Sequence, residues 1–181
     1  MYKSELFNCV PKSAGLYAFF QKYKGARTPC AYIGSSAAQG KGAGNLQSRL
    51  KQHLSLQIGT VGSKGRAVSV NIDQLTDCSY WVHQKFSEKI YLHAAELIFM
   101  DSLKPVYRNE NNIMKEAYNI LDDKHELHDP EFVSEMKKLA KNPSGTIPLP
   151  SLKGMDQKIN ELEMRVSEIE RIISNQRTGD E

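Results

Sequence analysis

Two short apolar segments near the N-terminus do most to restrict the fold of this chain. Residues 15–20 read GLYAFF and residues 30–34 read CAYIG, and the polar segment between them contains Gly25 and Pro29. Short apolar and aromatic runs bounded by turn residues are typical of buried strands. The two segments therefore predict an antiparallel hairpin, and the alternating pattern within residues 78–86 predicts a third strand.

Two helices are predicted around this third strand. Residues 46–57 follow helical spacing, and Asn45 is suited to be their N-cap. Residues 87–103 predict a second, more apolar helix, which ends at Lys104-Pro105 because proline disfavours helical backbone in the residue before it.

The sequence changes in character after Asn109. Residues 111–141 predict a helical extension, and residues 142–151, which hold three prolines, predict a linker. Apolar residues then repeat at steps of three and four over residues 152–176, which is the pattern of a coiled coil. The a positions are Leu152, Ile159, Val166 and Ile173, and the d positions are Met155, Leu162 and Ile169.

This register favours a parallel, two-stranded coiled coil, because β-branched residues occupy most a positions. The register covers about three heptads, which is close to the lower limit for stable helices. We therefore expect a homodimer, or a higher homo-oligomer, that also has a second contact within the N-terminal domain. The alternative is a single amphipathic helix that folds back on its own domain.

Composition limits the partners and the compartment. Residues 1–110 contain 14 Lys and Arg against 7 Asp and Glu, whereas residues 111–181 contain 10 against 14. A basic N-terminal part attracts a phosphate backbone, although the same charge also suits an ordinary surface. No apolar run predicts a membrane helix, and no secretory signal is expected. The three cysteines lack paired spacing, which favours free thiols in a reducing cytoplasm.

Glu96 is the only acid in the apolar stretch 90–99. A buried carboxylate needs a partner or a bound cation, and one carboxylate with waters and phosphate oxygens suits Mg²⁺. The alternative is a glutamate on the exposed side of an amphipathic helix. His93, three residues earlier, is a second candidate ligand, but a packing role is favoured for it.

Arg49 and His53 are four residues apart and therefore share one face of a helix. Arginine can neutralise phosphate oxygens, and histidine can take or relay a proton near neutral pH. Tyr17 and Tyr32 lie on the predicted strands, and a phenol with a pKa of about 10 needs nearby positive charge to act as a base. The structural alternatives are a solvated helix face and two packing tyrosines.

In kind and order these residues resemble the motifs of the GIY-YIG nuclease superfamily. The matching motifs are GLY at 15–17, YIG at 32–34, NLxxRLxxH at 45–53, Glu96, Lys104-Pro105 and Asn109. The resemblance covers residues 12–110, within a predicted nuclease domain of residues 1–110.

The resemblance implies an α/β (α+β) domain in which helices flank a three-stranded antiparallel sheet, followed here by the helices and the coiled coil. It also implies hydrolysis of DNA at a single site with one Mg²⁺, for which Mn²⁺ can substitute. The implied roles are general base for Tyr17, assistance for His53, orientation of water or phosphate for Tyr32, phosphate binding for Arg49, metal binding for Glu96 and shaping of the site for Asn109.

One departure from the superfamily pattern and two loops affect the details. Ser35 and Ser36 stand where many members of the superfamily carry a lysine, so that Lys41 is the candidate to assist Tyr17 instead. Residues 35–44 and 58–66 are rich in glycine and are predicted to be loops that contact DNA. The candidate DNA contacts are Lys41, Lys51, Lys64 and Arg66.

A compact nuclease with loop insertions and a dimerising tail resembles the restriction enzymes of this superfamily. The chain is therefore predicted to be a type II restriction-like endonuclease that acts on duplex DNA as a dimer. The alternatives are a structure-specific repair or mobile-element nuclease, and a non-catalytic DNA-binding module.

Overall fold

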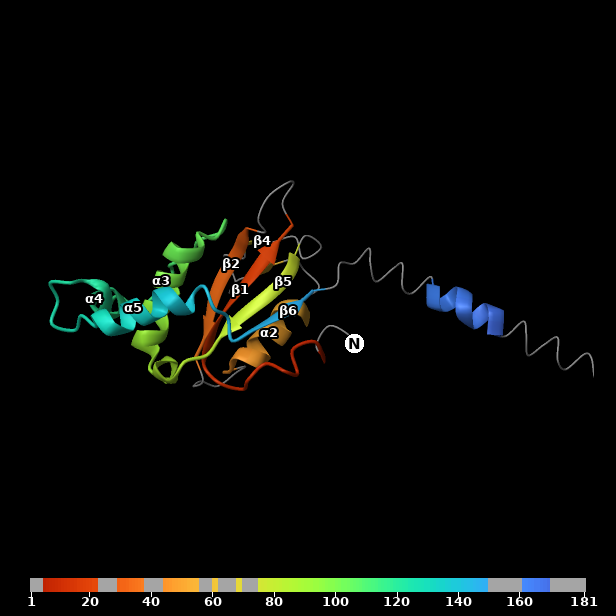
Figure 1. The fold of residues 1–181 in the computed structure, drawn as a ribbon, viewed down its shortest axis with the longest axis horizontal. Helices are drawn as coiled ribbons and strands as arrows, with labels where there is room; N and C mark the ends of the chain where they lie inside the picture. Colours follow the sequence, from red (N-terminus) through yellow and green to blue (C-terminus); the bar gives the residue numbers. More distant parts are fainter. Residues whose placement is uncertain are drawn as a thin grey trace, which may run out of the picture. The chain divides into compact units, whose positions relative to one another are not determined.

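The chain divides into two units, Met1–Leu149 and Pro150–Glu181. The computed structural model describes residues 5–22, 29–37, 44–55, 60–61, 68–69, 75–149 and 161–169. Figure 1 shows a sheet and its helices in the first unit, and a helix in the second.

A four-stranded antiparallel sheet forms the centre of the first unit, with strand order β2-β1-β5-β6 (Figure 1). These strands are β1 Gly15–Gln21, β2 Cys30–Ser36, β5 Leu75–Trp81 and β6 Gly145–Pro148. The predicted hairpin is confirmed by the pairing of β1 with β2, and the predicted third strand is confirmed as β5. A separate pair joins β3 Thr60–Val61 to β4 Val68–Ser69, at the loop predicted over residues 58–66.

The prediction of three strands is wrong, because β6 adds a fourth strand to the sheet. β6 lies within residues 142–151, the segment predicted to be a linker. It pairs with β5, its Ile147 is buried, and the hydroxyls of Ser79 and Thr146 are 2.9 Å apart across the two strands. Pro148 is compatible with this position because β6 is an edge strand. So short a strand, with a proline at its end, has too little alternation to be recognised in the sequence.

The two helices predicted around β5 are confirmed as α2 Leu46–Ser55 and α3 Lys89–Leu103. Asn45 is the N-cap residue of α2, as predicted, since the Ser48 backbone N–H donates to its Oδ1 at 2.9 Å. A short 3₁₀ helix, η2 Gln84–Ser87, connects β5 to α3. Beyond α3, α4 Glu116–Leu121 and α5 Pro130–Leu139 confirm the predicted helical extension.

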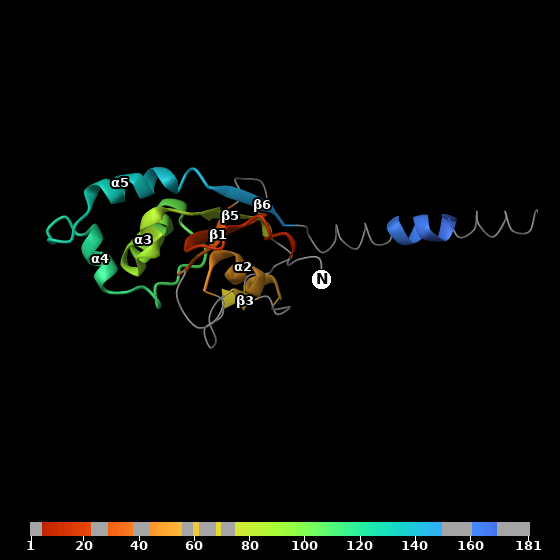
Figure 2. The same ribbon diagram turned by 90° about the horizontal axis from the view of Figure 1, so that it is seen from below.

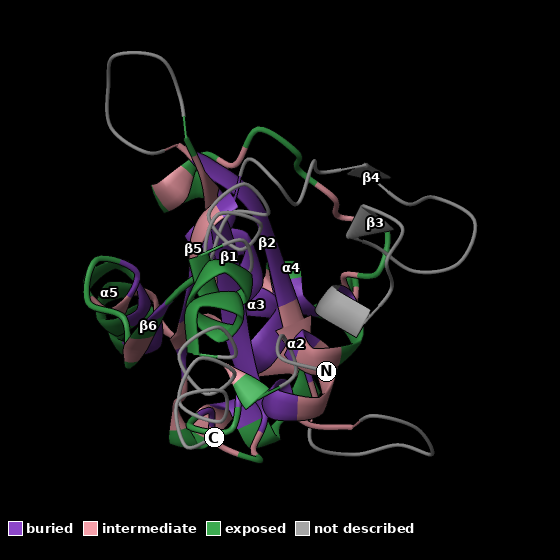
Figure 3. Cartoon of the chain, turned by 90° about the vertical axis from the view of Figure 1, so that its right-hand side faces the viewer, coloured by how far each residue is buried: buried purple, intermediate pink, exposed green. Residues whose placement is uncertain are grey.

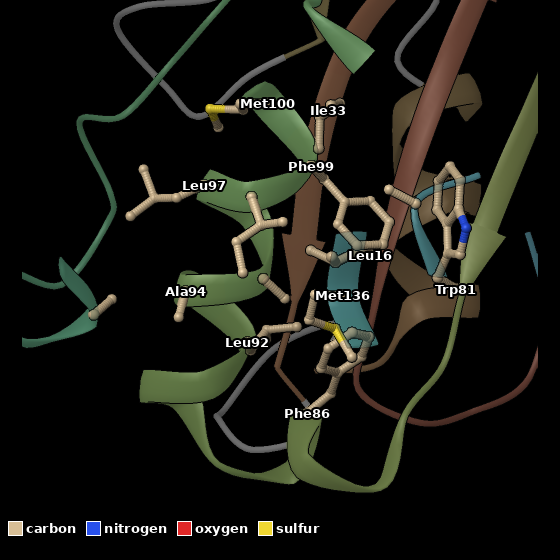
Figure 4. Close-up of a cluster of buried hydrophobic side chains, with 14 of the residues drawn as sticks. Leu16, Ile33, Trp81, Phe86, Leu92, Ala94, Leu97, Phe99, Met100 and Met136 are labelled. Atoms are coloured by element: carbon tan, nitrogen blue, oxygen red, sulfur yellow. The ribbon is translucent and has the colours of Figure 1, made fainter. Parts of the chain in front are cut away.

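The pleat of β1 sends alternate side chains to two separate clusters of buried residues. Leu16 and Ala18 belong to the cluster that also contains residues of α3, α4 and α5 (Figure 4). Tyr17 and Phe19 belong to the cluster that contains residues of α2 and of the segment before β1 (Figure 2). The candidate tyrosine therefore faces α2 rather than α3.

Helix α3 is buried along most of its length. Every residue from Leu92 to Met100 is buried, and Figure 3 shows this helix in the same buried colour as β1 and β2. The extension contributes to this burial, because Ile120 of α4 and Phe132 of α5 belong to the same cluster as α3. Glu96 has only 6% of its surface exposed, so the alternative of a glutamate on an exposed helix face is wrong.

The second unit contains a helix over residues 161–169, and all of these residues are exposed. The coiled coil expected over residues 152–176 is not shown in this single chain and stays a prediction; most of that segment lies outside the described residues. Within the described ranges, no helix is both long enough and apolar enough to cross a membrane.

Candidate functional site

The register of the central hairpin places the two candidate tyrosines together. Tyr17 pairs with Gly34 and Phe19 pairs with Tyr32, so that all four residues share the face of the sheet that α2 covers. The ring centroids of Tyr17 and Tyr32 are 6.3 Å apart. A Cβ atom at Gly34 would lie 2.5 Å from the Tyr17 Oη atom. Only glycine therefore lets the Tyr17 ring lie flat over β2.

Helix α2 brings His53 to Tyr17. Leu50 of α2 is fully buried, and the Gln47 amide donates to the backbone carbonyls of Asn8 and Val10 at 3.1 Å, which fixes the helix to the segment before β1. His53, in the last turn, is buried, and its Nε2 atom is 2.6 Å from the Tyr17 Oη atom. The resemblance implies that His53 assists Tyr17, and this hydrogen bond joins the two side chains.

Burial decides the protonation of this pair. Burial raises the pKa of Tyr17 well above its ordinary value, and the smaller influence of Arg49 in the opposite direction does not compensate. Burial, together with the Arg49 charge, lowers the pKa of His53 to about 3. Near neutral pH, Tyr17 is therefore a phenol and His53 is uncharged. In the tautomer with its proton on Nδ1, His53 accepts the Tyr17 O–H through Nε2.

Tyr32 lies in the same electrostatic environment. Its pKa is raised to about 12, by burial first and by the Glu96 carboxylate second, while Arg49 and a hydrogen bond with the Tyr17 side chain oppose the rise. Glu96 and Arg49 act in the same directions on Tyr17. Glu96 on α3 and Arg49 on α2 therefore influence the same two phenols in opposite directions.

Glu96 is an almost fully buried carboxylate. Burial raises its pKa from 4.5 to about 7, and a hydrogen bond with the Ser35 side chain lowers it in part. Ser35 pairs with Leu16 in the strand register and so shares the face of β2 that α3 covers. The sequence marked Ser35 only as the site of a missing lysine. Its contact with Glu96 had no sequence signal, because it depends on how α3 packs on β2.

His93 has a structural role. Its Nδ1 atom accepts a hydrogen bond from the Met114 backbone N–H at 3.0 Å, which ties α3 to the segment before α4. The packing role favoured for His93 is therefore confirmed.

The donor set around Glu96 suits a hard cation with few protein ligands. No group of three or more His, Cys, Asp and Glu residues that could hold a metal ion occurs in the part of the chain that the structure describes. Mg²⁺ commonly uses one or two carboxylates and completes its coordination with water and phosphate oxygens. A single buried carboxylate that is half-ionised near neutral pH, and whose charge acts on the pKa of Tyr32, fits this mode of binding.

The two remaining candidate catalytic residues, Arg49 and Asn109, lie on α2 and in a turn after α3. Arg49 is half-buried on α2, one helical turn before His53. Asn109 accepts a hydrogen bond from the Asn111 backbone N–H through Oδ1 at 3.1 Å, which stabilises a turn. That turn follows Tyr107, which forms a parallel β-bridge with Tyr32 at the outer edge of β2. The chain after α3 therefore returns to the strand that carries Tyr32.

The candidate DNA contacts are only partly described. Lys51 is half-buried, and its Nζ atom donates to the Asn8 Oδ1 atom at 2.7 Å. Lys41, Lys64 and Arg66 lie outside the described residues.

No protein-family model, no curated protein and no solved structure matches this chain. The GIY-YIG relationship is therefore a hypothesis that depends on the chain's own motif residues. The structure itself shows a hydrogen-bonded Tyr17–His53 pair whose tyrosine is influenced by the charges of Arg49 and Glu96.

Proposed function

We propose that this chain is a Mg²⁺-dependent endonuclease that hydrolyses DNA phosphodiester bonds with a GIY-YIG type of site. One observation carries the proposal: the hydrogen-bonded Tyr17–His53 pair lies in the electrostatic environment of the buried Glu96 and of Arg49. These groups come from one strand, β1, and two helices, α2 and α3. An ordinary core has no need of a buried carboxylate whose charge acts on a hydrogen-bonded phenol and imidazole.

The proton path uses the Tyr17–His53 pair. A free phenolate is not accessible to Tyr17, because burial raises its pKa. The phenol instead takes a proton from the attacking water at Oη while it gives its own proton to the His53 Nε2 atom, 2.6 Å away. The negative charge of the incoming phosphate favours protonation of His53 and opposes the burial that holds its pKa near 3.

The phosphate is bound by positive charge from two sides. Arg49 offers a planar guanidinium to the phosphate oxygens, and Tyr32 orients the phosphate or the water. Glu96 would hold Mg²⁺, which supplies positive charge that stabilises the charge growing on the phosphate. Ser35 hydrogen-bonds with Glu96 and thereby restricts the orientation of its carboxylate.

The proposed biological form is a type II restriction-like enzyme that acts on duplex DNA as a homodimer, since one such site cuts one strand. The three free cysteines favour a reducing compartment such as the cytoplasm. A structure-specific repair or mobile-element nuclease is the second candidate. Digestion of plasmid, flap and branched DNA with mapped ends separates the two, because only the first cuts intact duplex at a fixed sequence.

Replacement of Arg49 tests the proposal directly. We expect Arg49→Ala to reduce Mg²⁺-dependent nicking of supercoiled plasmid at least about a hundredfold, which is the usual effect of losing one donor to a developing anion. The fold should persist, because Arg49 is only half-buried.

Lys137→Ala is the matched control, since it removes a positive charge from an exposed position on α5. Equal losses in the two variants would point to a general effect of charge, and full activity in Arg49→Ala would exclude the proposed role.

The pH dependence of cleavage should follow Glu96. Its pKa of about 7 means that the ionised form is lost below neutrality. At limiting Mg²⁺ we expect kcat/KM to rise about tenfold per pH unit below pH 7 and to level off above it. Added Mg²⁺ should move the midpoint to lower pH, because the cation and the proton compete for one carboxylate. A flat profile between pH 5 and 8 would contradict this assignment.

A further inference from the structure

The described helix of the second unit carries an uncovered apolar stripe. Leu162, Val166 and Ile169 are 59%, 53% and 55% exposed. They occupy successive d, a and d positions of the heptad register, so that they lie on one side of the helix. An apolar stripe of this kind is stable in water only when another surface covers it.

Charges beside the stripe indicate what covers it. Within residues 152–170 of the same register, the g positions are Lys158 and Arg165, which are basic, and the e positions are Asp156, Glu163 and Glu170, which are acidic; the next g position, Ile172, is apolar. Glu163 and Arg165 belong to the described helix; the other three charged residues are placed by the sequence register alone. Over residues 156–170 the apolar stripe is therefore flanked by a basic side and an acidic side.

This separation of charge distinguishes between a parallel and an antiparallel pairing of two such helices. In a parallel pair of helices, each g residue lies beside the e residue of the following heptad on the other helix. Lys158 would then face Glu163 of the partner subunit, and Arg165 would face Glu170 of the partner subunit. In an antiparallel pair, g faces g and e faces e, which places like charges together. The pattern is complementary to itself only in the parallel orientation.

We propose that the segment around helix 161–169 pairs in parallel and in register with the same segment of a second copy of the chain. The apolar a and d residues supply the affinity, and the e and g charges select orientation and register. The pairing itself does not depend on the chemistry of the first unit. Its consequence does rest on the proposed function: paired tails keep a second nuclease unit at high effective concentration, so that a nick in one strand is followed by a nick in the other.

Charge reversal in the full-length chain tests the pairing. We expect Lys158→Glu with Arg165→Glu to raise the dimer dissociation constant at least about tenfold, because every e–g contact becomes repulsive. Adding Glu163→Lys and Glu170→Lys to the same chain should restore dimerisation, because the parallel contacts become attractive again. Sedimentation equilibrium over a wide concentration range measures all three proteins.

Disulfide formation tests the orientation. In a Cys9→Ser background, Val166→Cys should form an interchain disulfide readily, because equivalent a residues meet in a parallel, in-register pair. Ser167→Cys, at an outward b position, is the matched control and should remain reduced.

Three results would overturn the proposal: an unchanged dimer constant in the double reversal, no recovery in the fourfold reversal, or equal disulfide yields at positions 166 and 167. Plasmid nicking by the same proteins tests the proposed function separately. A wild-type dimer without Mg²⁺-dependent cleavage would refute the nuclease and leave the pairing intact. An active monomer would refute only the pairing.

Discussion

Glu96→Gln is expected to abolish Mg²⁺-dependent nicking and, at the same time, to stabilise the metal-free protein at pH 8. Burial raises the folded-state pKa of Glu96 from 4.5 to about 7. The folded protein therefore binds the proton more tightly than the unfolded chain does, and stability is lost as the pH rises between these two values. Above pH 7 the wild-type protein has therefore lost about 3 kcal/mol of its free energy of unfolding. The Glu96→Gln variant does not lose it, because its amide stays neutral.

Urea unfolding in EDTA at pH 8 and at pH 4.5 measures this effect. The gain in stability should be large at pH 8 and almost absent at pH 4.5, where the wild-type carboxyl is protonated in the folded state. Glu88→Gln, at an exposed position just before α3, is the matched control and should change neither nicking nor stability. If Glu96→Gln destabilised the protein at pH 8, the carboxylate would have a strong partner in the metal-free state, and the proposed metal role would fail.

Gly34→Ala is expected to reduce cleavage at least about a hundredfold and to destabilise the fold by about 1–3 kcal/mol. The added Cβ would lie 2.5 Å from Oη and 2.6 Å from Cζ of Tyr17, and 2.9 Å from Cε1 of Tyr32. Tyr17 is fully buried, so its ring has no free space to move into. The hydrogen bond with His53 should be lost together with the ring position.

Gly145→Ala provides the matched control for this substitution. Gly145 lies on β6, the edge strand farthest from β2, and its Cβ would meet the Tyr80 ring of β5 at 2.5 Å. Tyr80 is half-buried and can rotate toward solvent, so a smaller loss of stability and nearly normal nicking are expected. Thermal unfolding and plasmid nicking, measured on both variants, distinguish the two outcomes. If Gly34→Ala nicked DNA as well as Gly145→Ala does, the position of Tyr17 would not matter for cleavage.

Local patterns predicted the parts of the fold that depend on local forces. The hairpin of β1 and β2, the N-cap at Asn45 and helix α3 were all evident in the sequence, because turn residues, capping and apolar periodicity act over a few residues. Strand β6 was not evident, because it is stabilised by its pairing with β5, which is distant in the sequence.

In the candidate site, too, the sequence predicted what depends on motif residues and did not predict what depends on tertiary packing. The grouping of Tyr17 with His53 followed from motif order, but the protonation of the pair did not. Burial outweighs the Arg49 charge at Tyr17, and the degree of burial depends on how α2 packs on the sheet. The contact between Ser35 and Glu96 likewise depends on tertiary packing.

The late position of β6 in the chain has a consequence for synthesis. While the ribosome is still translating α4 and α5, β5 has no neighbour on one side and presents unpaired backbone N–H and C=O groups. An open strand edge of this kind readily pairs with another nascent chain. This edge of β5 is covered only after Gly145–Pro148 have emerged. Aggregation of this chain should therefore begin between nascent chains on one messenger RNA, rather than from instability of the finished protein.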